Sequence, residues 1–578
     1  MATAKRLYLY SVSGIGLGLV LYAETILMGL LFDKLGLGAS LPYSAPAGVQ
    51  ANRELLSLAI GLVAVGLPLW LFHWALVERM VSGDEAAAAV ERQSIVRAVY
   101  FGLLLLILVS QLAQSGVDVL HEAIVRPLGA GSGYYPISLS GALAGLVAYL
   151  GAFLYHAWIR ARDIRQGPTI MGAAAWGSRL FHYGLAVGLM IGALYAVGTV
   201  IVTAGQALTA GGQSLGPTSS NYYYGGLTPP PASSAPWWVF PLVGALSSVV
   251  VYGALWLAHW RYAAGLAARV DDQGVDERAS RVRLTYFVLV VASVVGYSLM
   301  YLSQALGLAL QFVVGLWHAK LGQPLWAEIL VSLLAALPIV AGWWWHRRRA
   351  TREWASEPGT ALRAIRPLDY FTSLIGIAVF GASLAMFIAA IGQKVTGFGL
   401  ANVSADAWRS QAVGTIALMA VAAPIWLWPW LAGQRRLAID PLGEKRSTAR
   451  KAFLLAVAGG TVIAGAGSLG FILYRLTRIA VGLNSSSLGE DVRMPLCSLA
   501  VSVGLLAYHL YWIRRDQDAV FLVGEGAQVP ALAGAATAAH ELVVVGPAGA
   551  DLEALRASLA ERLPDGFLIV VRPQEGTA

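Results

Sequence analysis

Long runs of apolar residues alternate with short clusters of charged residues along most of the chain. Many of these runs exceed the roughly 18 apolar residues that a membrane-spanning α-helix requires. Treating each run between charge clusters as one helix predicts about twelve spans. Their approximate extents are 7–31, 55–78, 97–123, 138–160, 179–206, 237–261, 283–314, 325–346, 368–393, 411–432, 451–480 and 494–514.

The ends of these spans recur in two alternating forms. Odd-numbered spans begin with a basic residue followed about a turn later by Tyr or Phe, and even-numbered spans end in aromatic residues and Arg. The openings are Arg6/Tyr10, Arg97/Tyr100, Arg179/Tyr183, Arg283/Tyr286, Arg366/Tyr370 and Arg450/Phe453. Recurrence roughly every 80 to 100 residues predicts an internal repeat of helical hairpins that enter the membrane from the same side.

The pattern therefore predicts an all-α integral membrane protein, with about twelve transmembrane helices arranged as six parallel helical hairpins. The hairpins would occupy residues 1–80, 81–165, 166–270, 271–352, 353–440 and 441–515. Residues 516–578 change character, with expected strands at Ala519–Gly524, Glu541–Gly546 and Gly566–Arg572 and an expected helix at Asp551–Leu563. They predict a small cytoplasmic α/β C-terminal appendage.

Composition and charge support a membrane protein and set its expected orientation. Hydrophobic residues make up 57% of the chain and charged residues only 12%, against about 25% charged in soluble domains. Basic residues gather in the loops between hairpins, so both termini are expected to be cytoplasmic. The expected partners are the lipid bilayer and other membrane proteins or a second copy, and no nucleic acid.

Two features at the ends of the spans have alternative interpretations. An aligned column near the ends of the even spans reads His73, His156, His259, Trp343, Pro429 and His509. Because the column also accepts Trp and Pro, interfacial anchoring is favoured over a ring of ligands or proton carriers. The uncharged segment 205–237 is interpreted as an irregular outer loop, with a binding lid as the alternative.

The third span carries the most polar face and is the best candidate for a site. Intramembrane carboxylates are costly to expose to lipid, so this face must look into the bundle or a wet cavity. The candidate polar vestibule for an ion, proton or small polar solute consists of Glu24, Gln111, Gln114, Asp118, His121, Glu122 and Gln304. The alternative is that these groups only hydrogen-bond neighbouring helices.

Motifs for catalysis or cofactor binding fail on their context. Gly465-Ala-Gly467-Ser-Leu-Gly470 has the spacing of a dinucleotide fingerprint but lies in the middle of a span, where glycines allow close helix packing. His121-Glu122 lacks the second histidine of a zinc-protease helix, since Val125 stands there. Cys497 is the only cysteine. No catalytic residue, cofactor or metal is therefore predicted.

The openings and closings of the first spans carry a family resemblance. Arg6-Leu-Tyr-Leu-Tyr10 opens one span, and Gly66-Leu-Pro-Leu-Trp-Leu-Phe-His73-Trp74 closes the next. These segments resemble an uncharacterised bacterial multi-pass membrane domain family, known as domains of unknown function, over residues 1–515. The resemblance implies membrane location and helical hairpins, and implies no activity. Two functions are left: a non-catalytic membrane scaffold or accessory subunit, or a transporter or channel using the polar vestibule.

Overall fold

A computed structural model of the protein describes the greater part of the chain. The described residues are 2–37, 46–82, 85–128, 139–166, 175–209, 236, 238–317, 324–355, 361–396, 407–483, 488–524, 540–546 and 567–573. They form two units, residues 1–517 and residues 518–578. Most of the uncharged segment expected as an outer loop, residues 210–235, lies outside the described residues.

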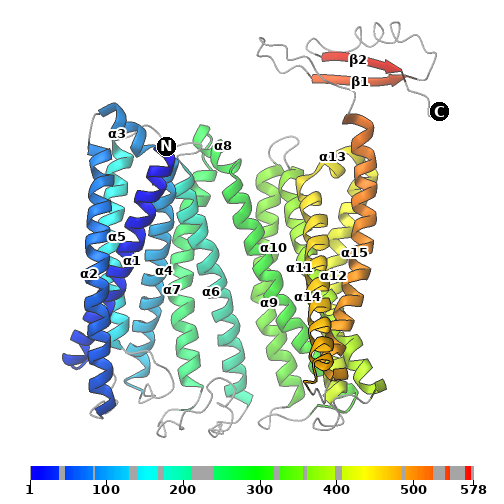
Figure 1. Ribbon diagram of the computed structural model, residues 1–578, viewed down its shortest axis with the longest axis horizontal. Helices are drawn as coiled ribbons and strands as arrows, with labels where there is room; N and C mark the ends of the chain where they lie inside the picture. The colour runs from blue at the N-terminus through cyan, green and yellow to red at the C-terminus, as the bar shows by residue number, and fades with distance from the viewer. Residues whose placement is uncertain are drawn as a thin grey trace. The chain divides into compact units, whose positions relative to one another are not determined.

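The prediction of about twelve spans is confirmed, because the described residues contain twelve helices that are long and apolar enough to cross a membrane (Figure 1). They are α1 (Ala2–Lys34), α2 (Pro46–Ser82), α4 (Ile95–Val125), α5 (Leu139–Arg165), α6 (Trp176–Thr209), α7 (Val239–Ala267), α9 (Arg281–Val313), α10 (Leu325–Ala355), α11 (Ala361–Thr396), α12 (Ala407–Ile439), α14 (Thr448–Ala480) and α15 (Leu488–Gly524). A helix of 33 residues such as α1 is about 50 Å long, against a hydrocarbon core of about 30 Å. Several turns of each long helix therefore extend beyond the hydrocarbon.

The described residues include three short helices that the apolar pattern did not predict, in the first, third and fifth connections between hairpins, all near the same ends of the long helices. They are α3 (Glu85–Arg92), α8 (Asp272–Arg278) and α13 (Pro441–Arg446). Two of them are capped in the same way, since the Asp271 side chain accepts a hydrogen bond from the backbone N–H of Gly274, and Asp440 accepts one from Gly443. Such a side-chain oxygen satisfies a donor that the first helical turn leaves unpaired.

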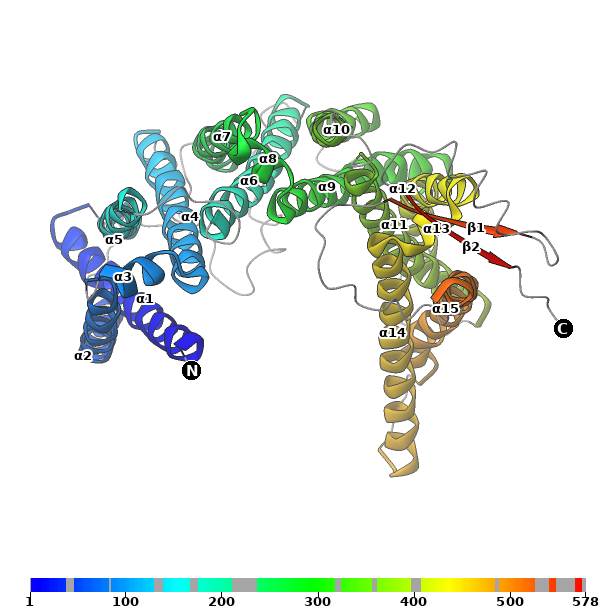
Figure 2. The same ribbon diagram turned by 90° about the horizontal axis from the view of Figure 1, so that it is seen from above.

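Helices that follow each other in the chain pack as antiparallel neighbours. This holds for α1 with α2, α4 with α5, α6 with α7, α9 with α10, and α11 with α12. Seen from above in Figure 2, these pairs follow one another in chain order along a curved row. The largest apolar cluster lies in the middle of the row and joins residues of α6, α7, α9 and α10 to residues of α11 and α12.

Most contacts between helices α1–α5 and α6–α10, and between α6–α10 and α11–α15, involve α4 and α9, and α10 also packs against α11. The α4 helix packs against α6 and α7, and α9 packs against α11 and α12. The crossing of α4 and α6 is close because small residues face each other, with Gly102 against Gly177, and a Cβ at Gly177 would collide with the carbonyl oxygen of Ala98. Small residues at such crossings let two backbones approach and gain packing contacts in lipid.

The second unit contains two described strands, β1 (His540–Gly546) and β2 (Phe567–Pro573), which pair in parallel with His540 opposite Phe567. The strand expected at Ala519–Gly524 is wrong, because these residues continue α15 to its end. The helix expected at Asp551–Leu563 lies outside the described residues. An α/β appendage is thus not supported by the described residues, which hold strands alone between 540 and 573.

Replacing Gly177 by Ala tests the close crossing of α4 and α6. The added Cβ would overlap the carbonyl oxygen of Ala98, and overpacking of this kind costs about 1–3 kcal/mol. Gly188→Ala in the same helix is the matched control, because no atom lies within 4 Å of its Cβ position. The control should be neutral or stabilising by up to about 1 kcal/mol. Unfolding of the detergent-solubilised protein measures both, and equal stability of the two variants would contradict the crossing.

Candidate functional site

A network of hydrogen-bonded charged and tyrosine side chains connects helices at one end of the first four long helices. Glu91 of α3 is buried and accepts a hydrogen bond from Arg6 Nε at 2.6 Å and another from the Tyr10 hydroxyl at 3.0 Å. The same hydroxyl accepts a hydrogen bond from Arg97 Nη1 at 3.0 Å, and Arg97 Nε donates to Asp163 Oδ2 at 2.8 Å. We call these five residues the first network. It joins α1, α3, α4 and α5.

The second network repeats this arrangement on α6, α8, α9 and α10. Glu277 of α8 accepts from Arg179 Nε at 2.9 Å and from the Tyr183 hydroxyl at 2.6 Å. Arg283 donates to that hydroxyl through Nη1, and its Nη2 lies 2.7 Å from Glu353 Oε2. Each residue thus has the role of its counterpart in the first network, with Glu353 in place of Asp163.

The third network has the same connections on α11, α13, α14 and α15. Glu444 accepts from Arg366 Nε at 2.7 Å and from the Tyr370 hydroxyl at 2.6 Å. Arg450 donates to that hydroxyl at 3.2 Å and, through Nε, to Asp516 Oδ2 at 2.6 Å. The guanidinium groups of Arg97, Arg283 and Arg450 are all fully buried.

A tryptophan and a histidine lie beside each network. The pairs are Trp74 with His156, Trp260 with His346, and Trp430 with His509, at ring distances of 5.4, 5.9 and 6.2 Å. All three histidines are buried, and each Nδ1 lies 2.8–2.9 Å from the backbone carbonyl four residues earlier. These histidines are therefore core residues and not anchors at the lipid interface. The aligned column contained Trp343 of α10, but His346 of the same helix is the residue that matches His156 and His509.

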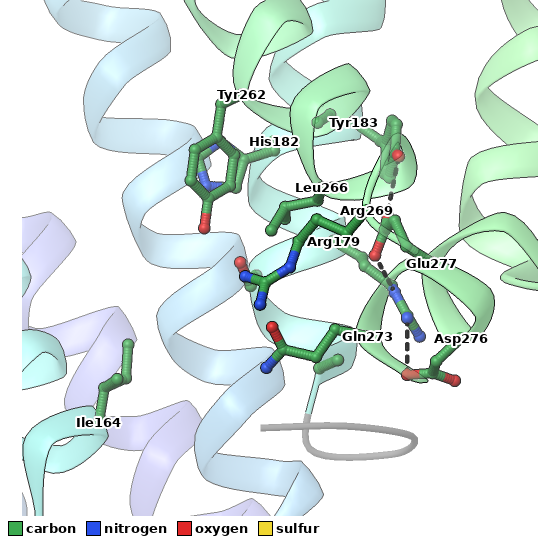
Figure 3. A pocket seen from close by; sticks show the side chains of 13 residues that line it. Ile164, Arg179, His182, Tyr183, Tyr262, Leu266, Arg269, Gln273, Asp276 and Glu277 are labelled. Atoms are coloured by element: carbon green, nitrogen blue, oxygen red, sulfur yellow. Dashed lines mark hydrogen bonds and ion pairs between the residues drawn. The ribbon is translucent and has the colours of Figure 1, made fainter. Parts of the chain in front are cut away.

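A pocket opens beside the second network (Figure 3). The pocket has a volume of about 490 Å³ and is lined by Arg179, His182, Tyr262, Arg269, Glu277 and neighbouring residues of α5 to α8. His182 Nδ1 lies 2.9 Å from His259 Nδ1, so one ring donates a hydrogen bond to the other. The Tyr262 ring lies 4.2 Å from that of His182.

Charges around this pocket are already paired with one another. Arg179 contacts both Asp276 and Glu277, and Arg269 contacts Asp271 at 2.5 Å. Hydrogen bonds from Arg269 and from the Gly274 backbone hold the pKa of the Asp271 carboxyl below its usual value. The described residues contain no group of three or more His, Cys, Asp or Glu side chains that could hold a metal ion. The pocket thus presents polar groups without an excess of either charge.

The candidate vestibule residues are distributed over three helices. On α4, Gln111 and Gln114 are exposed, Asp118 is half-buried, and His121 and Glu122 are buried. Gln114 Nε2 donates to Asp118 Oδ1 at 2.8 Å and its Oε1 accepts from the Tyr252 hydroxyl of α7 at 2.6 Å. These contacts join part of the predicted polar face to a neighbouring helix.

The remaining two vestibule residues lie on other helices. Glu24 is half-buried on α1, which packs against α2, α4 and α5. Gln304 is exposed on α9, which packs against α6, α10, α11 and α12. The helices that carry Gln304 and Asp118 thus share only α6 among their packing neighbours.

The fold and its charged networks define a polytopic helical membrane protein, and comparison with known families takes this one step further. Residues 6–155 and 366–502 match the family described as domain of unknown function DUF5671. The chain is thus similar to this uncharacterised family in two regions, consistent with the resemblance of its first spans. No curated protein and no solved structure matches the chain. The two regions contain most of the first and third networks, and the second network lies between them.

The glutamates of the networks were missed by sequence reasoning, although the sequence contains a signal for them. In each case the glutamate stands six residues before an arginine that opens a long helix, as in Glu91/Arg97, Glu277/Arg283 and Glu444/Arg450. The tyrosines were identified only as interfacial residues. Their spacing also separates two kinds of opening, since Tyr10, Tyr183 and Tyr370 follow their arginine by four residues, whereas Tyr100 and Tyr286 follow by three.

Removing one charge of a network tests whether the pairing holds the helices together. Arg450→Met leaves the carboxylate of Asp516 without its closest partner, and breaking a buried pair in this way costs about 3–5 kcal/mol. Adding Asp516→Leu removes the stranded charge, so the double variant should regain most of the lost stability. Chemical or thermal unfolding in detergent gives the free energies of unfolding for the cycle.

The exposed pair Arg269–Asp271 provides the control for this cycle. Both side chains are about half exposed, at 49% and 46%, so water screens their attraction. Arg269→Ala should therefore leave the unfolding transition almost unchanged. A large loss in this control, or none in Arg450→Met, would contradict a structural role of the third network.

Proposed function

We propose that the protein is a non-catalytic membrane scaffold or accessory subunit built from three four-helix units in tandem. The first unit is α1 to α5, the second α6 to α10 and the third α11 to α15, and each contains one of the networks. In this arrangement the six predicted hairpins combine in pairs, because two kinds of hairpin alternate along the chain. Two of the three units coincide with the regions matched by the domain of unknown function.

The threefold recurrence of a fully paired, buried charge network carries this proposal. Charges removed from water each cost several kcal/mol unless partners compensate them, so a buried network is retained where it holds a specific arrangement. In the first network both oxygens of Glu91 accept hydrogen bonds, and Arg97 contacts Tyr10, Asp163 and Glu78. Groups that satisfy one another in this way serve to connect helices.

The proposed location is a bacterial inner membrane, with the network ends and both chain termini on the cytoplasmic side. Clusters such as Arg347, Arg348 and Arg349 lie at the same ends of the long helices as the networks. Lys and Arg are retained on the cytoplasmic side during insertion, which supports this orientation. The paired strands β1 and β2 would then belong to a small cytoplasmic unit. A parallel pair needs a long crossover, for which residues 547–566 are sufficient.

Transport through the polar vestibule is the second candidate, and one observation favours it. The Tyr252–Gln114–Asp118 chain of hydrogen bonds places a half-buried carboxyl in the span of α4, and ionisable groups within spans often mark ion or proton pathways. The scaffold is favoured because these amides and the carboxyl bond to one another and to a neighbouring helix, which is the ordinary role of polar residues in helix bundles.

Flux measurements in reconstituted vesicles distinguish the two functions. A scaffold should give proton and ion flux no higher than that of vesicles containing a heat-inactivated sample. Asp118→Asn and Glu24→Gln should behave in the same way and keep the fold. A flux in the wild-type protein that both substitutions reduce tenfold or more would overturn the scaffold proposal in favour of transport. Tyr8→Phe, near the opposite helix ends, is the control for nonspecific effects of substitution.

A further inference from the structure

We infer that the chain associates head to tail with a second copy of itself, the exposed face of α14 in one chain packing on α1 and α2 of the next. This inference rests on the proposed three-unit scaffold. It follows from comparing the same helix faces in the three units, two of which are covered within the chain and one of which is not.

The first covered interface joins α4 to α6 and α7. Val109 and Ala113 of α4 are buried in one cluster with Leu185 and Leu189 of α6. Val251 of α7 packs against the same cluster, and its Cγ1 lies 3.7 Å from the Cβ position of Gly116. The third long helix of the first unit therefore buries one stripe of its surface against the first two helices of the second unit.

The second covered interface joins α9 to α11 and α12 by the equivalent positions. Counting from the network arginine, Val295 and Leu299 of α9 correspond to Val109 and Ala113 of α4. Both are buried in the large central cluster, together with Ala364 of α11, and Val421 of α12 packs against it. A Cβ at Gly307 would lie 3.7 Å from Cβ of Ala417. The two interfaces thus bury equivalent positions of α4 and α9 against the first two helices of the following unit.

The third copy of this surface, on α14, is uncovered. Val462 occupies the position of Val109 and Val295, yet it is 52% exposed, whereas they are 7% and 5% exposed. Ala466, at the next equivalent position, is also exposed. The surface is rich in small residues, and no atom lies within 4 Å of the Cβ positions of Gly459 or Gly470.

The complementary surface is uncovered at the other end of the row. Ala4 of α1 corresponds to Gly177 and Ala364, which are buried, but Ala4 is exposed. On α2, Val65 corresponds to Val251 and Val421, which are partly buried, and it is 60% exposed. Each chain therefore carries one free copy of each half of an interface that it has already formed twice.

Lipid contact alone does not account for these faces, because the lipid-facing positions are recognisable by exposure in all three units. Examples are Leu103, Leu289 and Ala456 on the third long helices, and Leu71, Leu257 and Leu427 on the second. The positions on the uncovered faces are different, because their equivalents in the other two units are buried. A contact between two different surfaces is heterologous, so it yields a closed ring or an extending row of chains.

Disulfide trapping between two chains tests the inference. Tyr474 of α14 and Gly61 of α2 correspond to Gly307 and Ala417, whose Cβ separation of 3.7 Å suits a disulfide. With Cys497→Ser as the background, chains carrying Y474C and differently tagged chains carrying G61C are reconstituted together and oxidised. The expected product is a mixed dimer, at least fivefold above the yield from A456C mixed with L71C, the two lipid-facing controls.

Two further outcomes separate this inference from the proposal on which it rests. The chain carrying G307C and A417C should form an internal disulfide, and failure there would overturn the shared interface of the three units as well. If that bond forms but the mixed dimer does not exceed the lipid-facing control, only head-to-tail association is overturned. Y474C chains that dimerise with one another as readily as with G61C chains would also overturn it, since that product requires two α14 faces in contact.

Discussion

The buried glutamate between an arginine and a tyrosine is the contact on which the helix arrangement depends. In the third network Glu444 has no exposed surface, and it receives hydrogen bonds from Arg366 and Tyr370 of α11. A carboxylate in such a place requires partners, because its desolvation otherwise costs several kcal/mol. The short helix α13 is therefore held over the start of α11. Through the tyrosine hydroxyl, Arg450 and the start of α14 are held as well.

Hydropathy predicted the membrane helices well because each is dominated by one local property, a long apolar stretch. It could not predict the short helices, since Glu85–Arg92, for example, has eight residues and no need to cross the membrane. Their position depends on contacts distant in sequence, such as Arg6 with Glu91. The spacing of glutamate and arginine is present in the sequence, but a single instance is uninformative. Its recurrence in three places indicates a structural role.

The histidine column shows how a local alignment can miss the structural equivalence. The aligned column contains Trp343, whereas His346 of the same helix is the residue that lies beside a tryptophan, as His156 and His509 do. The polar face of α4 shows what helical periodicity alone cannot predict. Helical periodicity places Gln114 and Asp118 on one face, but it cannot identify Tyr252 as their neighbour or assign Gln304 to a helix with other partners.

Tandem units of the proposed kind create a problem at the two ends of the chain that a single domain does not have. Repeat proteins generally end in capping units whose outer face suits the solvent, because each internal unit relies on its neighbours to cover its sides. In a bilayer an apolar face is tolerated without a cap, so exposure by itself does not force association. Small residues change this balance, since they give lipid little surface to contact and allow a second backbone to approach. The exposed face of α14 corresponds to surfaces that are covered in the other two units, and no atom lies near the Cβ positions of its glycines. A second copy of the chain would cover this face and pack against those glycines.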